Sequence, residues 1–178
     1  MKRVAIFLLI GFVLNACTNT KIFLVRHAEK GKESDDPHLT DQGKQRAEAL
    51  SSALRREKIK SIYSTKRNRT RETAEPLSKR IDVPIQYYSN DTTLKFLLKV
   101  MSEGKNTLIV GHSNTLLPML KALDLKPSIE EIPDNDYDNV FIVKIKRKSP
   151  AGYRMKLKET TYGKRSPAPG DTSTVMMK

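Results

Sequence analysis

The sequence predicts an α/β fold, a three-layer α/β/α sandwich with a mostly parallel central sheet. Two short apolar runs, at residues 22–25 and 107–110, have the unbroken hydrophobic character of strands that are buried on both faces. Helical and strand-like segments alternate along the chain, and this order is typical of a parallel sheet covered by helices. The length of 178 residues suits one domain with a sizeable core.

The first expected strand, at residues 22–25, leads through a polar loop at 31–38 into a helix at 39–57. Thr40 is a suitable N-cap for this helix, whose apolar residues recur at helical spacing. Gly43 lies in the first turn, where glycine lowers helix propensity. We therefore expect another backbone segment to pass close to Gly43.

A second strand is expected at residues 58–63, where apolar residues alternate with polar ones. A basic turn at 64–71 then leads into a helix at 72–80, which ends at the Asp-Val-Pro segment of residues 82–84. A third strand is expected at residues 85–88, so that strand and helix continue to alternate.

The next helix is expected to begin at Asp91 and to end at Gly104. Four of its apolar residues are expected on one side: Leu94, Leu97, Leu98 and Met101. The apolar strand at 107–110 follows it. A further helix at residues 116–123 has Pro118 near its start, where the missing N–H of proline is tolerated.

Residues 127–138 form an acidic, irregular connection to a pair of strands at 140–146 and 153–158. Lysines and arginines alternate with apolar residues over 144–158, which is typical of the solvent face of an edge strand. The tail at residues 164–178, with its prolines and glycine, is expected to be disordered.

The chain is strongly basic, with a net charge of +13 and a sequence pI near 9.8. Such a balance favours anionic partners, namely phosphates, nucleic acid or an acidic membrane surface. The sequence lacks the aromatic-rich basic motif of RNA-binding domains, and we expect no nucleic-acid partner.

The N-terminus has the layout of a secretory signal peptide. Two basic residues precede an apolar run at 4–14, which is short for a membrane span, and we expect the signal peptide to cover residues 1–16. A small residue before Cys17, the only cysteine, resembles a bacterial lipobox. Residues 17–20 would then tether the domain at 21–163 to the periplasmic or outer side of a bacterial membrane. Ordinary secretion with a free thiol is the alternative.

Polar clusters follow the expected strands at their carboxyl ends. The first strand is followed by Arg26 and His27, the strand at 107–110 by His112, and the second strand by a basic turn that contains Arg69. In a parallel sheet these ends meet at one edge, where ligands bind. Two guanidinium groups and two imidazoles would suit a phosphate dianion there.

Four motifs occur in the order found in one family: RHAEK at 26–30, LTDQGKQRAEAL at 39–50, RTRETA at 69–74 and GHSNT at 111–115. In this combination the sequence resembles the histidine phosphatase (phosphoglycerate mutase-like) superfamily, and its small phosphohistidine phosphatase-type members most of all. The segment IPDNDYDNVFIV at 132–143 resembles that family's acidic loop and closing strand. The likeness implies a phosphoglycerate mutase-like fold and a phosphatase activity.

The resemblance also implies a role for each site residue. His27 would be the nucleophile that forms a phosphohistidine, with its other ring nitrogen donating to a backbone carbonyl. Arg26, Arg69 and His112 would bind the phosphoryl oxygens, and Ser113 would join them in binding substrate. Alignment and charge neutralisation would suffice for this transfer, so that neither a metal nor a cofactor is expected.

A carboxylic acid would protonate the leaving group, as the family's mechanism requires. Asp91 is the first candidate because it follows the third strand at the start of a helix. Glu29 is the second, since it lies two residues from His27, and Asp36 is the third.

The sequence alone leaves several alternatives open. Arg67 and Arg71 are alternatives to Arg69 as the phosphate-binding arginine of this motif, although the Thr-Ala pair at 73–74 favours Arg69. A metal site at His27 and Glu29 lacks established ligand spacing.

A weakly catalytic or inactive phospho-ligand-binding domain on the membrane is the alternative function. The absence of long insertions argues against a sugar-phosphate mutase. The partner is a phosphorylated small molecule or phosphoprotein, and the substrate and oligomeric state stay open.

Overall fold

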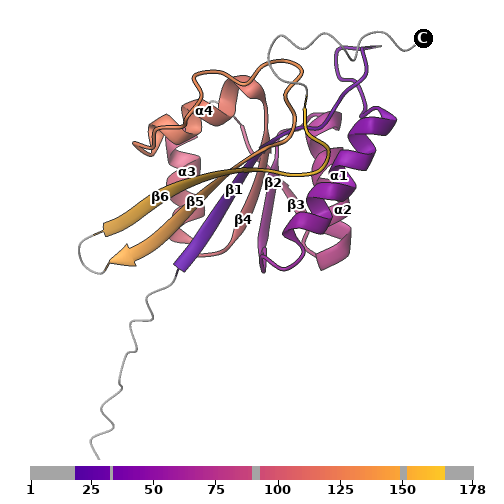
Figure 1. Cartoon of the computed structure of the whole chain (residues 1–178). Helices are drawn as coiled ribbons and strands as arrows, with labels where there is room; N and C mark the ends of the chain where they lie inside the picture. The colour runs from indigo at the N-terminus through magenta and orange to yellow at the C-terminus, as the bar shows by residue number, and fades with distance from the viewer. Residues whose placement is uncertain (1–18, 33, 90–92, 149–151, 167–178) are drawn as a thin grey trace, which may run out of the picture.

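The computed structural model describes residues 19–32, 34–89, 93–148 and 152–166. Within these ranges a six-stranded sheet lies between two layers of helices (Figure 1). The elements are, in chain order, β1 (Asn19–Arg26), α1 (Asp41–Leu54), β2 (Ser61–Ser64), α2 (Asn68–Ile81), β3 (Ile85–Tyr87), α3 (Thr93–Ser102), β4 (Thr107–Gly111), α4 (Ser113–Ala122), β5 (Asn139–Lys148) and β6 (Gly152–Thr161).

The sheet has the strand order β3-β2-β4-β1-β5-β6. The pairs β2·β3, β2·β4 and β1·β4 are parallel, whereas β1·β5 and β5·β6 are antiparallel. In the register of β1 and β4, Ile22 lies beside Thr107 and Arg26 beside Gly111. The expectation of a mostly parallel sheet is therefore confirmed, with the late strand pair added as an antiparallel hairpin at one edge.

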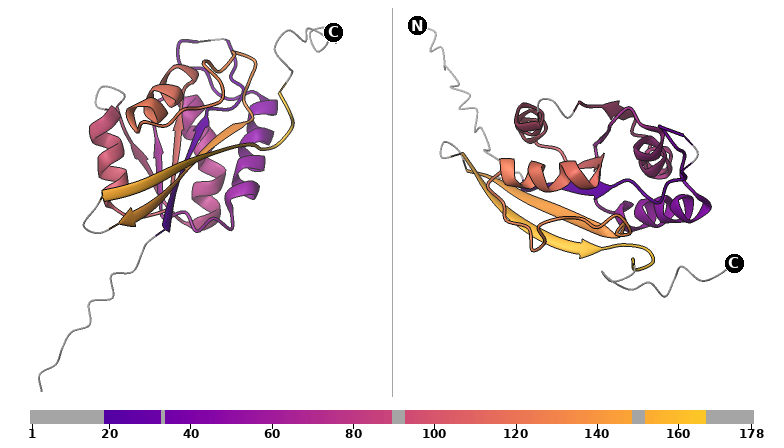
Figure 2. Two further views of the ribbon diagram at one scale, coloured as in Figure 1. Left: turned by 60° about the vertical axis from the view of Figure 1, so that its left-hand side comes forward. Right: turned by 90° about the horizontal axis from the view of Figure 1, so that it is seen from above.

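Alternate residues of β1 supply both halves of the core. Ile22 and Leu24 belong to the cluster formed with α3 and α4, whereas Phe23 and Val25 belong to the cluster formed with α1 and α2. Figure 2 shows these two helix pairs on opposite sides of the sheet. Because a strand sends successive side chains to opposite faces, an unbroken apolar run is what a doubly covered strand needs. The predicted three-layer sandwich is confirmed.

Two helices begin earlier than the sequence pattern indicated. α2 starts at Asn68 instead of residue 72, because the Asp36 carboxylate accepts the first backbone N–H of this helix at 3.0 Å. α4 starts at Ser113 and not at residue 116, with the His112 N–H donating to the Thr115 hydroxyl at 3.0 Å. Pro118 consequently lies inside α4 and not in its first turn. Polar first turns carry no apolar period, and for this reason the pattern missed them.

The predicted core side of α3 is confirmed at Leu97 and Met101 and is wrong at Leu94 and Leu98. Its buried residues are Phe96, Leu97, Val100 and Met101, whereas Leu94 is 49% exposed and Leu98 51% exposed. The Phe96 ring stacks on Tyr88 with centroids 4.6 Å apart and meets Tyr63 edge to face at 5.1 Å. Aromatic contact of this kind turns the bulky ring inward and leaves the two leucines outside.

Two further boundaries differ. The second strand begins at Ser61, three residues later than expected, because Lys58 has a left-handed backbone with φ of 51°. At the other end, ordered contacts continue to Ser166, whose N–H donates to the Asp138 carboxylate at 2.8 Å. The domain contacts thus extend past the expected boundary at residue 163. Residues 164–166 of the expected tail are ordered here.

Two expectations lie outside the described residues: the signal peptide at 1–16 and the lipid anchor at Cys17. The greater part of the expected tail, from residue 167 on, also lies outside them. Within the described part of the chain, no helix has the length and apolar character needed to cross a bilayer.

Candidate active site

His27 and His112 meet at the carboxyl edge of the sheet. Each histidine follows its strand directly, His27 after β1 and His112 after β4, and these two strands are parallel neighbours. The backbone N–H of His27 donates to the Gly111 carbonyl at 3.0 Å, and the ring centroids lie 5.4 Å apart at an angle of 64°. The structure thus places both imidazoles together, as the sequence led us to expect.

The hydrogen bond at Nδ1 determines which nitrogen of His27 is free. Nδ1 lies 2.8 Å from the Ala28 carbonyl oxygen, which can only accept, so that Nδ1 carries the proton. The lone pair is therefore on Nε2. Ala28 is itself held, because its N–H donates to the Thr73 hydroxyl at 2.9 Å and this hydroxyl donates to the Arg69 carbonyl at 2.7 Å. The end of β1 is tied to α2 in this way.

Both site histidines are neutral near pH 7. The pKa of His27 is lowered to about 3, chiefly by burial and also by the charges of Arg26, His112 and Arg69, against the opposing hydrogen bond to Ala28. The pKa of His112 is likewise lowered to about 4, chiefly by burial and also by the charges of Arg69, Arg67 and Arg26, against the opposing charge of Asp36. A neutral imidazole keeps its lone pair available to a phosphorus atom.

Arg69 faces this cluster, and its rival Arg67 lines the cleft beside His112, whereas Arg71 is engaged elsewhere. The Nη1 of Arg69 lies 3.6 Å from the Asp36 carboxylate, and its Nε is buried without a hydrogen-bond partner among the described residues. Arg71 instead pairs with Glu72 at 3.3 Å and Glu75 at 3.5 Å. The buried, unpartnered N–H of Arg69 is a donor that an anion would satisfy.

Arg26 is buried beneath the loop at residues 132–137, and its guanidinium is 5% exposed. Its Nη1 donates to the carbonyl oxygens of Pro133 at 2.6 Å and Asp136 at 3.0 Å, and its Nη2 lies 3.5 Å from Asp134. The Tyr137 ring lies against the guanidinium, 4.4 Å from Cζ. The Nε of Arg26 has no partner among the described residues. This loop therefore positions Arg26 and leaves one donor free.

Thr65 holds His112. Its hydroxyl oxygen lies 3.0 Å from His112 Nε2 and 2.8 Å from the Thr70 hydroxyl. Thr65 is buried and directly follows β2, at the start of the basic turn. Nothing in its sequence surroundings marks it as a site residue, because a single threonine after a strand is ordinary. Its role follows only from the spatial approach of β2 and β4.

A cleft of about 610 Å³ opens beside His112. It is lined by Thr65, Lys66, Arg67, Tyr87, Tyr88, Ser89 and His112. Its cations would attract a phosphorylated ligand. Ser113, a predicted substrate-binding residue, is the first residue of α4 and is half-buried beside this cluster. The first backbone N–H groups of that helix are suitable donors to an anion.

The three carboxylates considered as general acid have different surroundings. Glu29 is held by Arg46, whose Nε lies 2.8 Å from one Glu29 oxygen and 2.9 Å from the other. Asp36 accepts the Asn68 N–H and faces Arg69. Asp91 lies outside the described residues. In the part of the chain that the structure describes, no three His, Cys, Asp or Glu side chains gather as a metal-ligating group.

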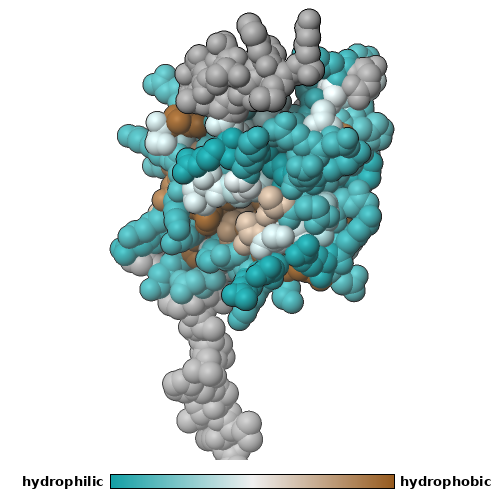
Figure 3. All heavy atoms as spheres, turned by 45° about the vertical axis from the view of Figure 1, so that its right-hand side comes forward, coloured by the Kyte–Doolittle hydropathy of each residue, from teal (hydrophilic) through white to brown (hydrophobic). Residues whose placement is uncertain are grey.

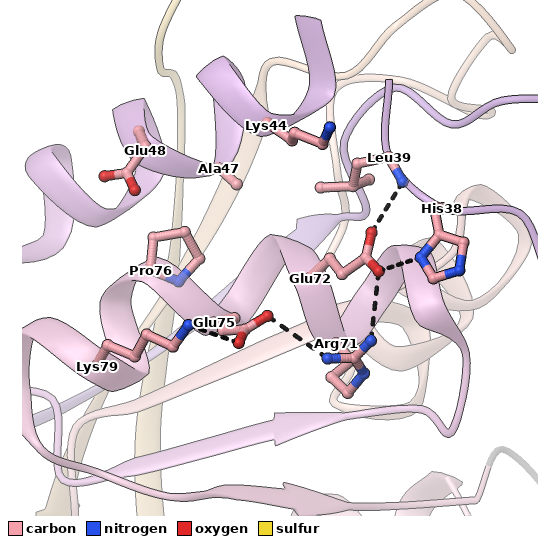
Figure 4. A pocket seen from close by; sticks show the side chains of 10 residues that line it. All are labelled: His38, Leu39, Lys44, Ala47, Glu48, Arg71, Glu72, Glu75, Pro76 and Lys79. Carbon is pink, nitrogen blue, oxygen red and sulfur yellow. Dashed lines mark hydrogen bonds and ion pairs between the residues drawn. The ribbon is translucent and has the colours of Figure 1, made fainter. Parts of the chain in front are cut away.

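The third histidine, His38, lies outside the histidine cluster. It lines a hollow between α1 and α2, where its Nδ1 contacts the Glu72 carboxylate (Figure 4). Of the charged side chains drawn there, Glu75 pairs with Lys79 at 2.8 Å and with Arg71 at 3.5 Å. This hollow therefore has no surplus of positive charge comparable to that around His27.

Comparison with known proteins agrees with this geometry. The model of the histidine phosphatase superfamily (branch 1) matches residues 22–90, which include His27 and Arg69. A search of curated protein sequences found no match.

Several solved structures share the fold. The mycobacterial glucosyl-3-phosphoglycerate phosphatase Rv2419c is 12% identical, with a TM-score of 0.63 over 82% of this chain and 100% of its own. A protein of Agrobacterium tumefaciens assigned as the phosphohistidine phosphatase SixA is 18% identical, with a TM-score of 0.55 over 80% and 97%. A phosphoserine phosphatase of Entamoeba histolytica is 15% identical, with a TM-score of 0.55 over 82% and 97%.

Proposed function

We propose that this chain is a phosphatase of the histidine phosphatase type, as the match of that family's model to residues 22–90 suggests, and that it acts through a phosphohistidine on His27 without a metal ion. The observation that carries the proposal is the environment of His27. Its Nδ1 is occupied by the Ala28 carbonyl, its Nε2 is free, and its ring lies beside His112 and the charge of Arg69. This combination suits attack on a phosphorus atom whose oxygens are bound by cations.

The reaction has two steps. In the first, the Nε2 lone pair of His27 forms a bond to phosphorus while the bond from phosphorus to the leaving oxygen or nitrogen breaks. The leaving group takes a proton from a carboxylic acid, while Arg26, Arg69 and His112 bind the equatorial oxygens. In the second, a water attacks the phosphohistidine, gives its proton to the same carboxylate and releases phosphate and neutral His27.

Asp91 is our proposal for the acid. It follows Ser89, which lines the cleft beside His112, by two residues. Glu29 is committed to the buried Arg46, with a distance of 2.7 Å from the Nη2 of that arginine, and Asp36 faces Arg69. Turnover of an aryl phosphate should fall strongly in Asp91→Asn and little in Glu29→Gln. An Asp36→Asn variant with the larger loss would assign the acid to Asp36.

The proposed substrate is a phosphomonoester or a phosphoramidate carried by a small molecule or a phosphoprotein. The likeness to the small phosphohistidine phosphatase-type members supports this class, as does a fold that matches phosphatases of 12–18% identity over nearly their whole length. An imidazole leaving group, as in phosphohistidine, would depend less on the acid than an alkoxide would.

Hydrolysis of an aryl phosphate in the presence of EDTA tests the proposal. The chain should turn over, His27→Ala should not, and His38→Ala should keep its activity because His38 lies outside the cluster. Activity that survives in His27→Ala, or that disappears with the chelator, would contradict the mechanism. Capture of one phosphate per chain without turnover would show that the chain is a phospho-ligand-binding domain instead.

We also propose that the chain is exported and lipid-anchored through Cys17 in a bacterial cell envelope. The apolar run at 4–14 and the small residue before Cys17 support this proposal. Labelled palmitate should be incorporated by the full chain and not by Cys17→Ser. Incorporation that persists in Cys17→Ser would rule out the anchor.

A further inference from the structure

One face of β1, β5 and β6 carries cations in adjacent register positions. Lys21 of β1 lies beside Lys144 of β5, and Lys144 lies beside Lys156 of β6. One step along the strands, Lys146 lies beside Arg154. We call this set the basic face: Lys21, Lys144, Lys146, Arg154, Lys156 and Lys158. Lys158 lies beside Ile142 on the same side of the hairpin.

The like charges of the basic face lower the stability of the sheet. Like charges directly opposite each other on neighbouring strands destabilise their pairing. An edge strand needs some charge to avoid aggregation, yet mixed signs would serve this purpose as well. Among the described residues, Lys21 has an acidic partner, Glu57 at 2.6 Å, whereas Lys144, Lys146 and Lys156 form no ion pair. This repulsion between neighbouring cations points to an anionic partner that binds the basic face and compensates its charge.

The basic face lies at the end of the sheet away from the histidines. β1 runs from Asn19, beside Lys146, towards Arg26, beside Gly111 and the site. The face lines a hollow of about 450 Å³ that includes Asn19 and Thr20. Figure 3, with the side of α1 and α2 turned forward, shows that hydrophilic residues dominate the visible surface around a small apolar patch. A partner bound at the basic face would leave the histidine cluster open.

The N-terminal segment that we propose to associate with the membrane ends next to this face. Cys17 precedes Asn19 by two residues, a reach of about 7 Å. Whether Cys17 is lipidated or the apolar run at 4–14 is retained, the bilayer then lies within a few residues of β1. The Debye length is about 10 Å at 0.1 M salt, so that cations of the basic face would act on the headgroups with little screening.

We propose that the basic face binds the anionic headgroups of the membrane to which the chain is tethered, with the histidine cluster directed away from the bilayer. The partner is identified by its chemistry: a planar array of phosphates close to the start of β1. Double-stranded nucleic acid offers a similar charge density but is not favoured, since no feature of the chain brings it to Asn19. This inference rests on the proposed membrane anchor at the N-terminus, and the binding is independent of the proposed phosphatase activity.

Fluorescence quenching can test this contact, since the chain has no tryptophan. In Asn19→Trp the single tryptophan lies beside Lys146 of β5, on the same side of the sheet as the basic face and at an exposed position. The full chain is inserted by its own N-terminal segment into phosphatidylcholine vesicles with spin-labelled headgroups. The vesicles contain either no phosphatidylglycerol or about 30 mol% of it, the order of the anionic content of natural membranes.

Quenching should be at least about twofold stronger in the anionic vesicles at about 0.1 M salt and should lose this difference at about 1 M salt. The triple variant Lys144→Gln, Lys146→Gln, Lys156→Gln should lose it at low salt. The matched control removes three exposed lysines from the other side of the sheet: Lys95→Gln, Lys121→Gln and Lys126→Gln. It should keep the difference, and both triple variants should hydrolyse an aryl phosphate as the parent does.

Equal quenching in neutral and anionic vesicles would overturn the proposal. So would a difference that the triple variant keeps, or one that both triple variants lose equally, because net charge alone would then explain it. Loss of binding to double-stranded DNA in the triple variant, with unchanged vesicle quenching, would assign the basic face to nucleic acid instead.

Discussion

The imidazole rings of His27 and His112 lie edge to face with their centroids 5.4 Å apart, although one comes from each half of the chain. Their separation follows from strand register. Arg26 of β1 is paired with Gly111 of β4, and each histidine is the next residue along its strand. A shift of register would carry the rings apart, because each residue along a strand advances about 3.3 Å. The pairing of two buried strands thereby sets the geometry of the site.

Removal of the Thr65 hydroxyl should loosen His112. In Thr65→Val the side chain keeps its volume and loses the oxygen that lies 3.0 Å from His112 Nε2. A net hydrogen bond is worth about 0.5–1.5 kcal/mol, so that kcat/KM for an aryl phosphate should fall about two- to tenfold. Thr65→Ser should restore most of the loss. A Thr65→Val variant with lower thermal stability and unchanged kcat/KM would show a purely structural role.

Glu29 should prove structural. Glu29→Ala leaves the side chain of Arg46, 3% exposed, as an unpaired buried charge, and we expect the free energy of unfolding to fall by about 3–5 kcal/mol. Asp41→Ala breaks a pair with Lys44 that is exposed, and should cost less than about 1 kcal/mol. Urea unfolding measures both. If turnover per folded molecule of Glu29→Gln fell as far as in Asp91→Asn, Glu29 would be the acid after all.

Gly43 should not tolerate a methyl group. A Cβ at this position would lie 2.1 Å from the backbone oxygen of Glu29, and that oxygen also accepts the Thr40 N–H at 2.9 Å. Because backbone cannot move aside as a side chain does, Gly43→Ala should lower the free energy of unfolding by about 3 kcal/mol. Ser52→Ala, at an exposed position of the same helix, should change it little. Equal urea midpoints for the two variants would contradict the close approach.

Stability should decline in acid because of His27. Its pKa is about 3 in the folded chain against an ordinary 6.5, so that between these values the unfolded chain binds more protons. The free energy of unfolding therefore rises with pH through this window. The contribution of His27 to stability is lost as pH falls from about 6.5 towards 3. His27→Gln should reduce the slope near pH 5 by up to about 1.4 kcal/mol per pH unit. An unchanged slope in urea titrations would show that His27 is not a buried neutral base.

The strands and the histidine cluster could be predicted because their signals are local. The runs at 22–25 and 107–110 are apolar without interruption, and parallel strands bring whatever follows them to one edge. The close approach of backbone to Gly43 could also be predicted, because few other structural reasons explain a glycine in the first turn of a helix. Each of these conclusions needs only residue type and spacing.

The contacts that hold the site could not be predicted in the same way. Arg26 is bound by the carbonyl oxygens of Pro133 and Asp136, and every residue has a carbonyl oxygen whatever its side chain. The burial of Leu94 and Leu98 in α3 was predicted wrongly because leucine spacing alone does not account for the stacking of Phe96 on Tyr88. Such outcomes depend on how distant elements pack, which no local pattern encodes.

The most direct test of the account is to trap the phosphorylated enzyme. The full chain is mixed with a labelled aryl phosphate, quenched in alkali, and analysed by mass spectrometry and by phosphorus NMR of the modified ring. We predict an alkali-stable, acid-labile label on Nε2 of His27, because Nδ1 donates to the Ala28 carbonyl. A label on Nδ1 or on another residue, or steady turnover with no label at His27, would contradict the proposed mechanism.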